Sequence, residues 1–212
     1  MKNLTWIWIA PLACGLWFAP QGQAEEPKAS VVGTVQIPLV KKYATVVYLD
    51  SVVKPMAGDT SQVVIMHQKG KAFAPRVLPV AVGTTVEFLN EDSFQHNVFS
   101  PDFPPGEPAK GGQKYYDLGS WGQGEKRFRK FDRVGIYTQL CALHPEMSGY
   151  IMVLPNPYFA SVDPDGNFRI DGVPPGDWKI KVWNEHMKPK QLEKSYGVSV
   201  LNGSEAKVVI TP

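Results

Sequence analysis

The stretch YTQLCALHPEMSGYIMVL places a thiol, an imidazole and a thioether three residues apart, at Cys141, His144 and Met147. A second imidazole, His96, lies far upstream in VEFLNEDSFQHNVFS, after a strand pattern and a short turn. Thiolate and thioether suit Cu(I), and imidazole serves both oxidation states of copper. One Cys with two His and a weak axial Met is the donor set of blue-copper sites. These residues therefore predict a copper site between a short loop and a neighbouring strand.

Other chemistries use only part of this set. A Cys-x-x-His pair is half of a structural zinc site, but such sites close with further Cys or His, and the sequence holds no second pair. Cys141 and His144 could serve as nucleophile and base, a role in which Met147 has no use. Met147 by itself is open between a ligand and a core residue, because Met often fills gaps in cores. We expect His67 and His186 to lie at the surface and not to bind the metal.

The N-terminus predicts export. Lys2 precedes an apolar run from Leu4 to Ala19, and the small residues of Gly22-Gln23-Ala24 follow it, so residues 1–24 are expected to be a signal peptide. A retained membrane anchor and a lipoprotein modified at Cys14 are the competing interpretations, and Pro11 argues against both. No later stretch approaches the roughly 18 apolar residues of a membrane span. We therefore expect a periplasmic protein without stable membrane insertion.

Removal of residues 1–24 leaves Cys141 as the single cysteine of the mature chain. Exported proteins usually pair their cysteines. An unpaired one indicates an intermolecular disulfide, an inert buried thiol, or a reactive or metal-bound thiolate. Loss of Lys2 from the 22 basic residues leaves 21 against 20 acidic ones, a balance that gives no reason to expect nucleic acid. We expect a monomer.

The elements that must position these donors are strands. Short runs rich in Val, Ile, Tyr and Phe alternate with Gly, Pro, Asn and Asp, which predicts an all-β chain of sandwiches or barrels. After Pro155 the sequence FASVDPDGNFRIDGVPPGDWKIKVW reads as a meander of strands and turns. Asp163, Asp165 and Asp171 could be calcium ligands, but the bidentate acid of an EF-hand-type loop is missing. A hairpin turn explains Asp-Gly between apolar runs more simply.

Residues 61–155 resemble the cupredoxins, most closely the amicyanin and plastocyanin type. The segment Cys141-Ala142-Leu143-His144-Pro145-Glu146-Met147-Ser148-Gly149 matches the family's short ligand loop, Cys-x-x-His-Pro-x-Met-x-Gly, in full. The spacing from Asn90 to His96 also fits. The resemblance implies a Greek-key β-sandwich and one type 1 copper ion bound by His96, Cys141, His144 and Met147.

Two departures from the family concern the surroundings of the thiolate. Many cupredoxins link the Asn after the first His to a Ser or Thr after the Cys; here Asn97 faces Ala142, so we expect this link to be missing. The family often has Pro where this chain has Leu143. We expect the amides of Leu143 and Asn97 to point at the sulfur of Cys141 and to raise the reduction potential, so that Leu143→Pro lowers it.

The rest of the chain resembles a carboxypeptidase-regulatory-like β unit. This likeness covers residues 156–212, and residues 30–53, within the N-terminal segment 25–60, look like its opening strands. We therefore expect a cupredoxin sandwich together with a small C-terminal β-sandwich. Such a likeness says little about function, which is read from sites.

The expected function is one-electron transfer by a periplasmic blue-copper protein that is not an enzyme. Its partner would be a redox protein such as a cytochrome or a dehydrogenase, approaching apolar residues around Leu143 and Pro145. The basic run Lys126-Arg127-Phe128-Arg129-Lys130 could steer an acidic partner, or it could protect an edge strand by its charge. Two alternatives remain: a copper carrier or buffer, and a β binding module in which copper is incidental.

Overall fold

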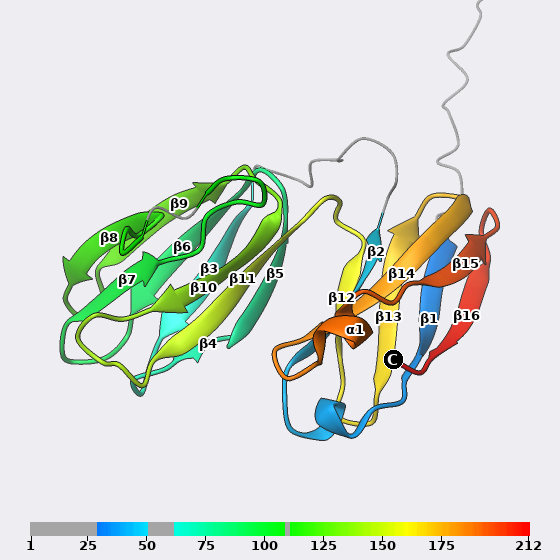
Figure 1. Ribbon diagram of the computed structural model, residues 1–212, viewed down its shortest axis with the longest axis horizontal. Coiled ribbons are helices and arrows are strands. Elements are labelled where there is room, and N and C mark those ends of the chain that lie inside the picture. The colour runs from blue at the N-terminus through cyan, green and yellow to red at the C-terminus, as the bar shows by residue number, and fades with distance from the viewer. Residues whose placement is uncertain (1–28, 51–61, 109–110) are drawn as a thin grey trace, which may run out of the picture.

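The computed structural model describes residues 29–50, 62–108 and 111–212. These residues form two β-sandwiches that lie beside each other (Figure 1). We call them the central sandwich, built from β3 to β11, and the outer sandwich, built from β1, β2 and β12 to β16. The helices are single turns, η1 (Pro38–Lys41) and α1 (Pro189–Leu192). The prediction of an all-β fold is confirmed.

The central sandwich has two sheets. Val, Phe, Tyr and Trp side chains from both sheets fill the space between them, around Phe88, Trp121 and Tyr137. One sheet has the strand order β5-β11-β10-β7-β8 and the other β4-β3-β6-β9. The strands are β3 (Val63–Gln68), β4 (Phe73–Ala74), β5 (Val77–Ala81), β6 (Thr84–Asn90), β7 (His96–Ser100), β8 (Tyr116–Trp121), β9 (Lys126–Phe131), β10 (Gly135–Leu140) and β11 (Ser148–Leu154).

The outer sandwich combines strands from the two ends of the described chain. Its sheets have the orders β13-β1-β16 and β12-β2-β14-β15, and β1 runs parallel to β16 and antiparallel to β13. Its own apolar core includes Val31, Leu49, Ile170 and Ile180. The strands are β1 (Ala29–Val35), β2 (Thr45–Asp50), β12 (Phe159–Val162), β13 (Asn167–Val173), β14 (Gly176–Asn184), β15 (Tyr196–Val200) and β16 (Glu205–Ile210).

The Asp-Gly segment between β12 and β13 is a turn. The carboxylate of Asp163 accepts hydrogen bonds from the amides of Asp165 and Asn167, at 2.9 and 2.7 Å, and the Gly166 amide donates to the Asp163 carbonyl. The side chain that could have been a calcium ligand therefore caps its own turn.

The two sandwiches meet through a small apolar cluster. Val77, Met152 and Leu154 of the central sandwich pack with Val46 and Trp183 of the outer one. At the border of this cluster, the Tyr150 and Trp183 rings lie edge to face with centroids 5.3 Å apart. The outer sandwich is therefore packed against β5 and β11, and β11 begins where the Cys-x-x-His-Pro-x-Met loop ends.

Some predictions fall outside the described residues. The expected signal peptide, residues 1–24, is one of them, and so are residues 51–61, where the N-terminal segment was expected to join the cupredoxin region. None of the helices in the described part of the chain is long and apolar enough to cross a membrane.

Candidate metal centre

The four predicted ligands occupy one end of the central sandwich. His96 is the first residue of β7, and Cys141 directly follows β10. These strands are neighbours, with Leu140 opposite Phe99 in their ladder. His144 and Met147 lie in the loop between β10 and β11, where the Met147 amide donates to the His144 carbonyl at 2.9 Å. Adjacent strand ends thus bring together residues 45 positions apart in the sequence.

Two imidazole nitrogens converge on one sulfur. Nδ1 of His96 lies 4.0 Å from the Cys141 Sγ, and Nδ1 of His144 lies 3.6 Å from it. Metal–sulfur and metal–nitrogen bonds of roughly 2.3 and 2.05 Å, at roughly 120° to each other, separate the two donor atoms by about 3.8 Å. The observed distances lie on either side of that value. The three donors therefore fit around one ion, and within the described residues they form the only group of three or more His, Cys, Asp or Glu side chains with this property.

Met147 is the remaining predicted ligand, and it lies in the same loop as His144. Its side chain is 1% exposed and belongs to the same buried cluster as Cys141. A buried thioether beside a thiolate and two imidazoles is the composition that blue-copper sites use.

The motif's final glycine has a steric reason. A Cβ atom on Gly149 would lie 2.9 Å from the Cβ of Phe73 and 3.1 Å from the Arg76 carbonyl oxygen. The chain leaving the loop therefore passes too close to the β4–β5 segment to carry a side chain.

The expected absence of a link across the site is wrong. The side-chain oxygen of Asn97 accepts a hydrogen bond from the backbone amide of Ala142 at 3.2 Å, and its Nδ2 donates to Asp117 and to the Gly119 carbonyl, both at 2.8 Å. The strand of the first histidine is thus tied to the residue after the cysteine. A backbone N–H serves in place of a hydroxyl group, so Ala at position 142 does not remove the link.

The sulfur itself accepts one backbone hydrogen bond. The Asn97 amide lies 3.3 Å from Sγ, as expected, while among the described residues no such bond comes from Leu143. Hydrogen bonds withdraw charge from a thiolate and stabilise the reduced metal. The structure therefore supports the expected tuning through Asn97 and not through Leu143.

Asp92 is a site residue that the sequence analysis missed. Its Oδ2 lies 2.8 Å from Nε2 of His96, the ring nitrogen that faces away from the sulfur. Partial burial raises the pKa of Asp92, but hydrogen bonds from the amides of Lys71 and Gly70 and from His96 outweigh it and lower that pKa to about 2. A carboxylate therefore holds the outer nitrogen of His96, a predicted metal ligand. The sequence signal was an acid four residues before a ligand.

The accessible side of the site is aromatic and apolar. His96 is fully buried, whereas His144 is half-buried and Leu143 is 48% exposed. The Phe94 ring, 40% exposed, lies 5.1 Å from the His96 ring and 5.3 Å from the His144 ring. Phe94, also missed from the sequence, thus covers both imidazoles at the surface.

The other two histidines lie elsewhere, as expected. Nδ1 of His67 contacts Glu91 at 2.6 Å, and the ring of His186 packs on Tyr43 with centroids 3.8 Å apart. Neither residue belongs to the group of three donors.

The comparisons with known proteins agree with the donor set. The family of copper-binding proteins of the plastocyanin/azurin type matches residues 60–154, just under half of the chain. No curated protein matches the chain significantly.

Three solved structures illustrate the similarity. The copper-containing nitrite reductase of Thermus scotoductus SA-01 is 31% identical over 47% of this chain and 25% of that one, with a TM-score of 0.37. A purple cupredoxin from Nitrosopumilus maritimus is 25% identical over 43% and 97% of the two chains, with a TM-score of 0.35. Amicyanin from Paracoccus versutus is 20% identical over 50% and 96%, with a TM-score of 0.37. Residues 60–154 thus match the plastocyanin/azurin family of copper-binding proteins and carry the complete ligand-loop motif of a cupredoxin.

Proposed function

We propose that this chain is a periplasmic type 1 copper protein that carries single electrons, with one copper ion bound by His96, Cys141, His144 and Met147. The observation that supports this most is the convergence of two Nδ1 atoms on the buried Cys141 sulfur, at 4.0 and 3.6 Å. When bound, copper supplies a one-electron couple between Cu(II) and Cu(I).

The residues around the site favour electron transfer over catalysis. Four protein donors leave no position open for a substrate, which metal-ion catalysis requires. Anchored strand ends and the Asn97 link hold the donors in one arrangement for both oxidation states. The half-buried His144, beside Phe94 and Leu143, gives a partner a short route to the site through a small apolar patch. Weak redox encounters use small contacts of this kind.

The partner in this proposal is a redox protein such as a cytochrome or a dehydrogenase. The basic run is strand β9, at the edge of its sheet. The Arg127 and Arg129 guanidinium groups lie over the rings of Trp121 and Tyr116, 5.3 and 3.9 Å from their centroids. Two of the four basic side chains thus cover aromatic residues of the sandwich, which favours the edge-protecting role over steering.

A copper carrier is the first alternative, and the burial of the donors speaks against it. His96, Cys141 and Met147 are all at most 4% exposed. Transfer of the ion to another protein needs ligands that an acceptor can reach one after another, and here only His144 is accessible.

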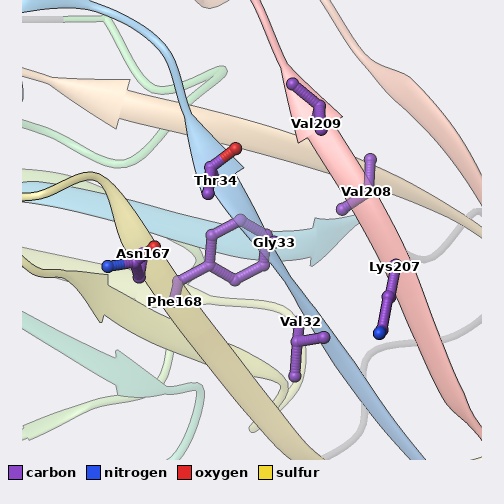
Figure 2. A pocket seen from close by; sticks show the side chains of 8 residues that line it. All are labelled: Val32, Gly33, Thr34, Asn167, Phe168, Lys207, Val208 and Val209. Carbon is purple, nitrogen blue, oxygen red and sulfur yellow. The ribbon is translucent and has the colours of Figure 1, made fainter.

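A binding module in the outer sandwich is the second alternative. Figure 2 shows the side chains that line a pocket on the sheet β13-β1-β16: Val32, Gly33, Thr34, Asn167, Phe168, Lys207, Val208 and Val209. Its single aromatic residue, Phe168, is 6% exposed. The lining thus lacks an accessible ring on which a sugar could stack, and binding sites rely on such apolar contacts together with polar groups.

Titration of the apo protein with Cu(II) tests the proposal. We expect one equivalent to produce intense visible absorption from thiolate-to-copper charge transfer and an EPR spectrum with narrow copper hyperfine splitting. Cys141→Ser and His144→Ala should abolish both signals, whereas the matched His186→Ala should keep them. Repeated reduction and reoxidation without loss of metal should follow. A colourless wild-type protein, or colour that survives in Cys141→Ser, would exclude a type 1 site; metal loss on reduction would favour the carrier.

A further inference from the structure

Asp92 is held by a turn that aims two amides at it. The hairpin between β3 and β4 has two central residues, Gly70 and Lys71, with φ angles of +61° and +56°. Lys69 and Ala72 exchange backbone hydrogen bonds across this hairpin, at 3.0 and 3.2 Å. Positive φ at both central positions is typical of a type I′ turn, in which a residue such as Lys is strained relative to Gly.

This conformation places consecutive N–H groups on one side of the turn. The Gly70 amide donates to Asp92 Oδ1 at 2.8 Å, and the Lys71 amide donates to Oδ2 at 3.0 Å. Successive amides in such a concave arrangement stabilise an anion. The Asp92 amide in turn donates to the side chain of the fully buried Asn90 at 2.9 Å. The carboxylate is therefore fixed in position by three backbone hydrogen bonds of this region.

The same Oδ2 atom faces His96. The His96 side chain is 0% exposed and that of Asp92 12%, so water screens the 2.8 Å contact only weakly. A carboxylate on Nε2 keeps the proton on that nitrogen, which leaves the lone pair of Nδ1 free to bind the metal. It also makes the imidazole a stronger donor.

We propose that Asp92 is a positioning residue of the copper site: it fixes the tautomer and orientation of His96 and lowers the reduction potential. This inference rests on the proposed copper site. The metal and the thiolate together carry one positive charge in the oxidised state and none in the reduced state. A nearby anion therefore stabilises the oxidised state, in opposition to the Asn97 amide on the sulfur.

The first test compares Asp92→Asn with Glu91→Gln in the full-length mature protein. Each substitution removes one carboxylate charge, from adjacent residues, but Glu91 contacts His67 and Lys69 and not His96. Loss of a partner that orients a metal-binding His costs about 10–100-fold in metal affinity. We expect Asp92→Asn to lower Cu(II) affinity at least tenfold more than Cu(I) affinity, which raises the midpoint potential by about 59 mV per tenfold difference. Glu91→Gln should shift the potential much less.

The second test uses the wild-type protein, so that it holds even where Asp92→Asn fails to fold. In the diamagnetic Cu(I) form, NMR should detect the Nε2–H proton of His96 as a downfield, slowly exchanging signal. A rapidly exchanging or missing proton would overturn the inference, as would equal potential shifts in Asp92→Asn and Glu91→Gln. A wild-type protein that develops no blue colour would instead refute the copper site itself, so the two failures are distinguishable.

Discussion

The ion pair between Arg76 and Glu185 joins the two sandwiches, and its two ends differ strongly in exposure. Nε and Nη2 of Arg76 donate to the two carboxylate oxygens of Glu185 at 2.7 and 2.8 Å. The Arg76 side chain is 47% exposed and that of Glu185 only 7%. Removal of the arginine therefore leaves a nearly buried carboxylate with only the Tyr150 hydroxyl group and, at 4.0 Å, His186 beside it. Neutralisation of the glutamate instead leaves a guanidinium group that water can reach. We predict that Arg76→Ala is the more destabilising change.

Protonation sets an upper limit on the unfolding free energy that Arg76→Ala loses by leaving the carboxylate without the arginine. A carboxylate left without its partner can take up a proton, and from an ordinary pKa of 4.5 this costs at most about 3.4 kcal/mol at pH 7. Arg76→Ala also loses the hydrogen bond from Nη1 to the Ser148 carbonyl at 3.0 Å. Because the pair is partly solvated, we expect a decrease in unfolding free energy of about 2–3 kcal/mol for Arg76→Ala and about 1 kcal/mol for Glu185→Gln.

The stability that Arg76→Ala loses relative to the wild type should become smaller as the pH falls. The hydrogen bond from Arg76 lowers the pKa of Glu185 in the folded protein, against the opposing effect of burial. The pair therefore contributes its full stability above the unfolded-state value of 4.5 and loses it as the pH falls through the folded-state pKa. In Arg76→Ala, acid instead relieves the unpaired carboxylate. The difference between wild type and variant should thus shrink between pH 7 and pH 4.

Calorimetric unfolding at pH 7 and pH 4 measures these stability differences for the two single variants and for the double variant Arg76→Ala/Glu185→Gln. Arg169→Ala is a matched control, because Arg169 bridges Asp171 and Glu205 on the surface of the outer sandwich, where all three side chains are more than 40% exposed. That variant should lose much less stability than Arg76→Ala, because water screens its exposed ion pairs. Adding Glu185→Gln to Arg76→Ala should recover part of the loss. Equal costs for the two single variants, or a penalty that stays constant down to pH 4, would refute the reasoning.

Three further predictions concern the ligand loop. Gly149→Ala should destabilise the protein by about 1–3 kcal/mol in urea unfolding, because the new Cβ meets Phe73 at 2.9 Å; an unchanged midpoint would contradict the close approach. Asn97→Ala removes the acceptor of the Ala142 amide, so it should lower the unfolding free energy by about 1–3 kcal/mol and speed copper release to a chelator. An unchanged rate of copper release would mean that the Asn97 link does not hold the loop. Met147→Leu should cost less than about 1.5 kcal/mol but raise the midpoint potential in voltammetry, because the copper loses a thioether donor; an unchanged potential would make Met147 a core residue.

Residue type and spacing were enough to predict two of the three converging donors, Cys141 and His144. Thiolate and imidazole are rare in this chain, and a ligand loop between two strands is local in sequence, so Cys141 and His144 could be paired with little structural knowledge. His96 needed the further assumption that its strand lies beside β10. The all-β fold could be predicted because short runs of β-branched and aromatic residues favour strands, and the Gly, Pro, Asn and Asp residues between them favour turns.

The hydrogen bonds and ion pairs around the predicted ligands could not be predicted from residue type and spacing. The Asn97 link could not be predicted from the residue type after Cys141, because every residue except Pro has a backbone amide that can donate this hydrogen bond. Asp92 required knowledge of where the β3–β4 turn lies in space. Arg76 and Glu185 are 109 residues apart, and only the packing of the two sandwiches brings them together. Contacts of this kind depend on tertiary structure and not on local pattern.

These contacts together determine how rigid the ligand loop is. The loop has seven residues, 141–147, and it is fixed at its start by Asn97, which binds the Ala142 amide, and at its end by Arg76, which binds Ser148 directly after Met147. Arg76 is itself fixed by Glu185, so the outer sandwich contributes to holding the end of the loop although it supplies none of the proposed ligands. Rapid electron transfer requires that the donors move little between oxidation states. The Asn97 anchor is buried, so a partner of the proposed electron carrier that docked at Phe94 and Leu143 would leave this link to the start of the loop intact.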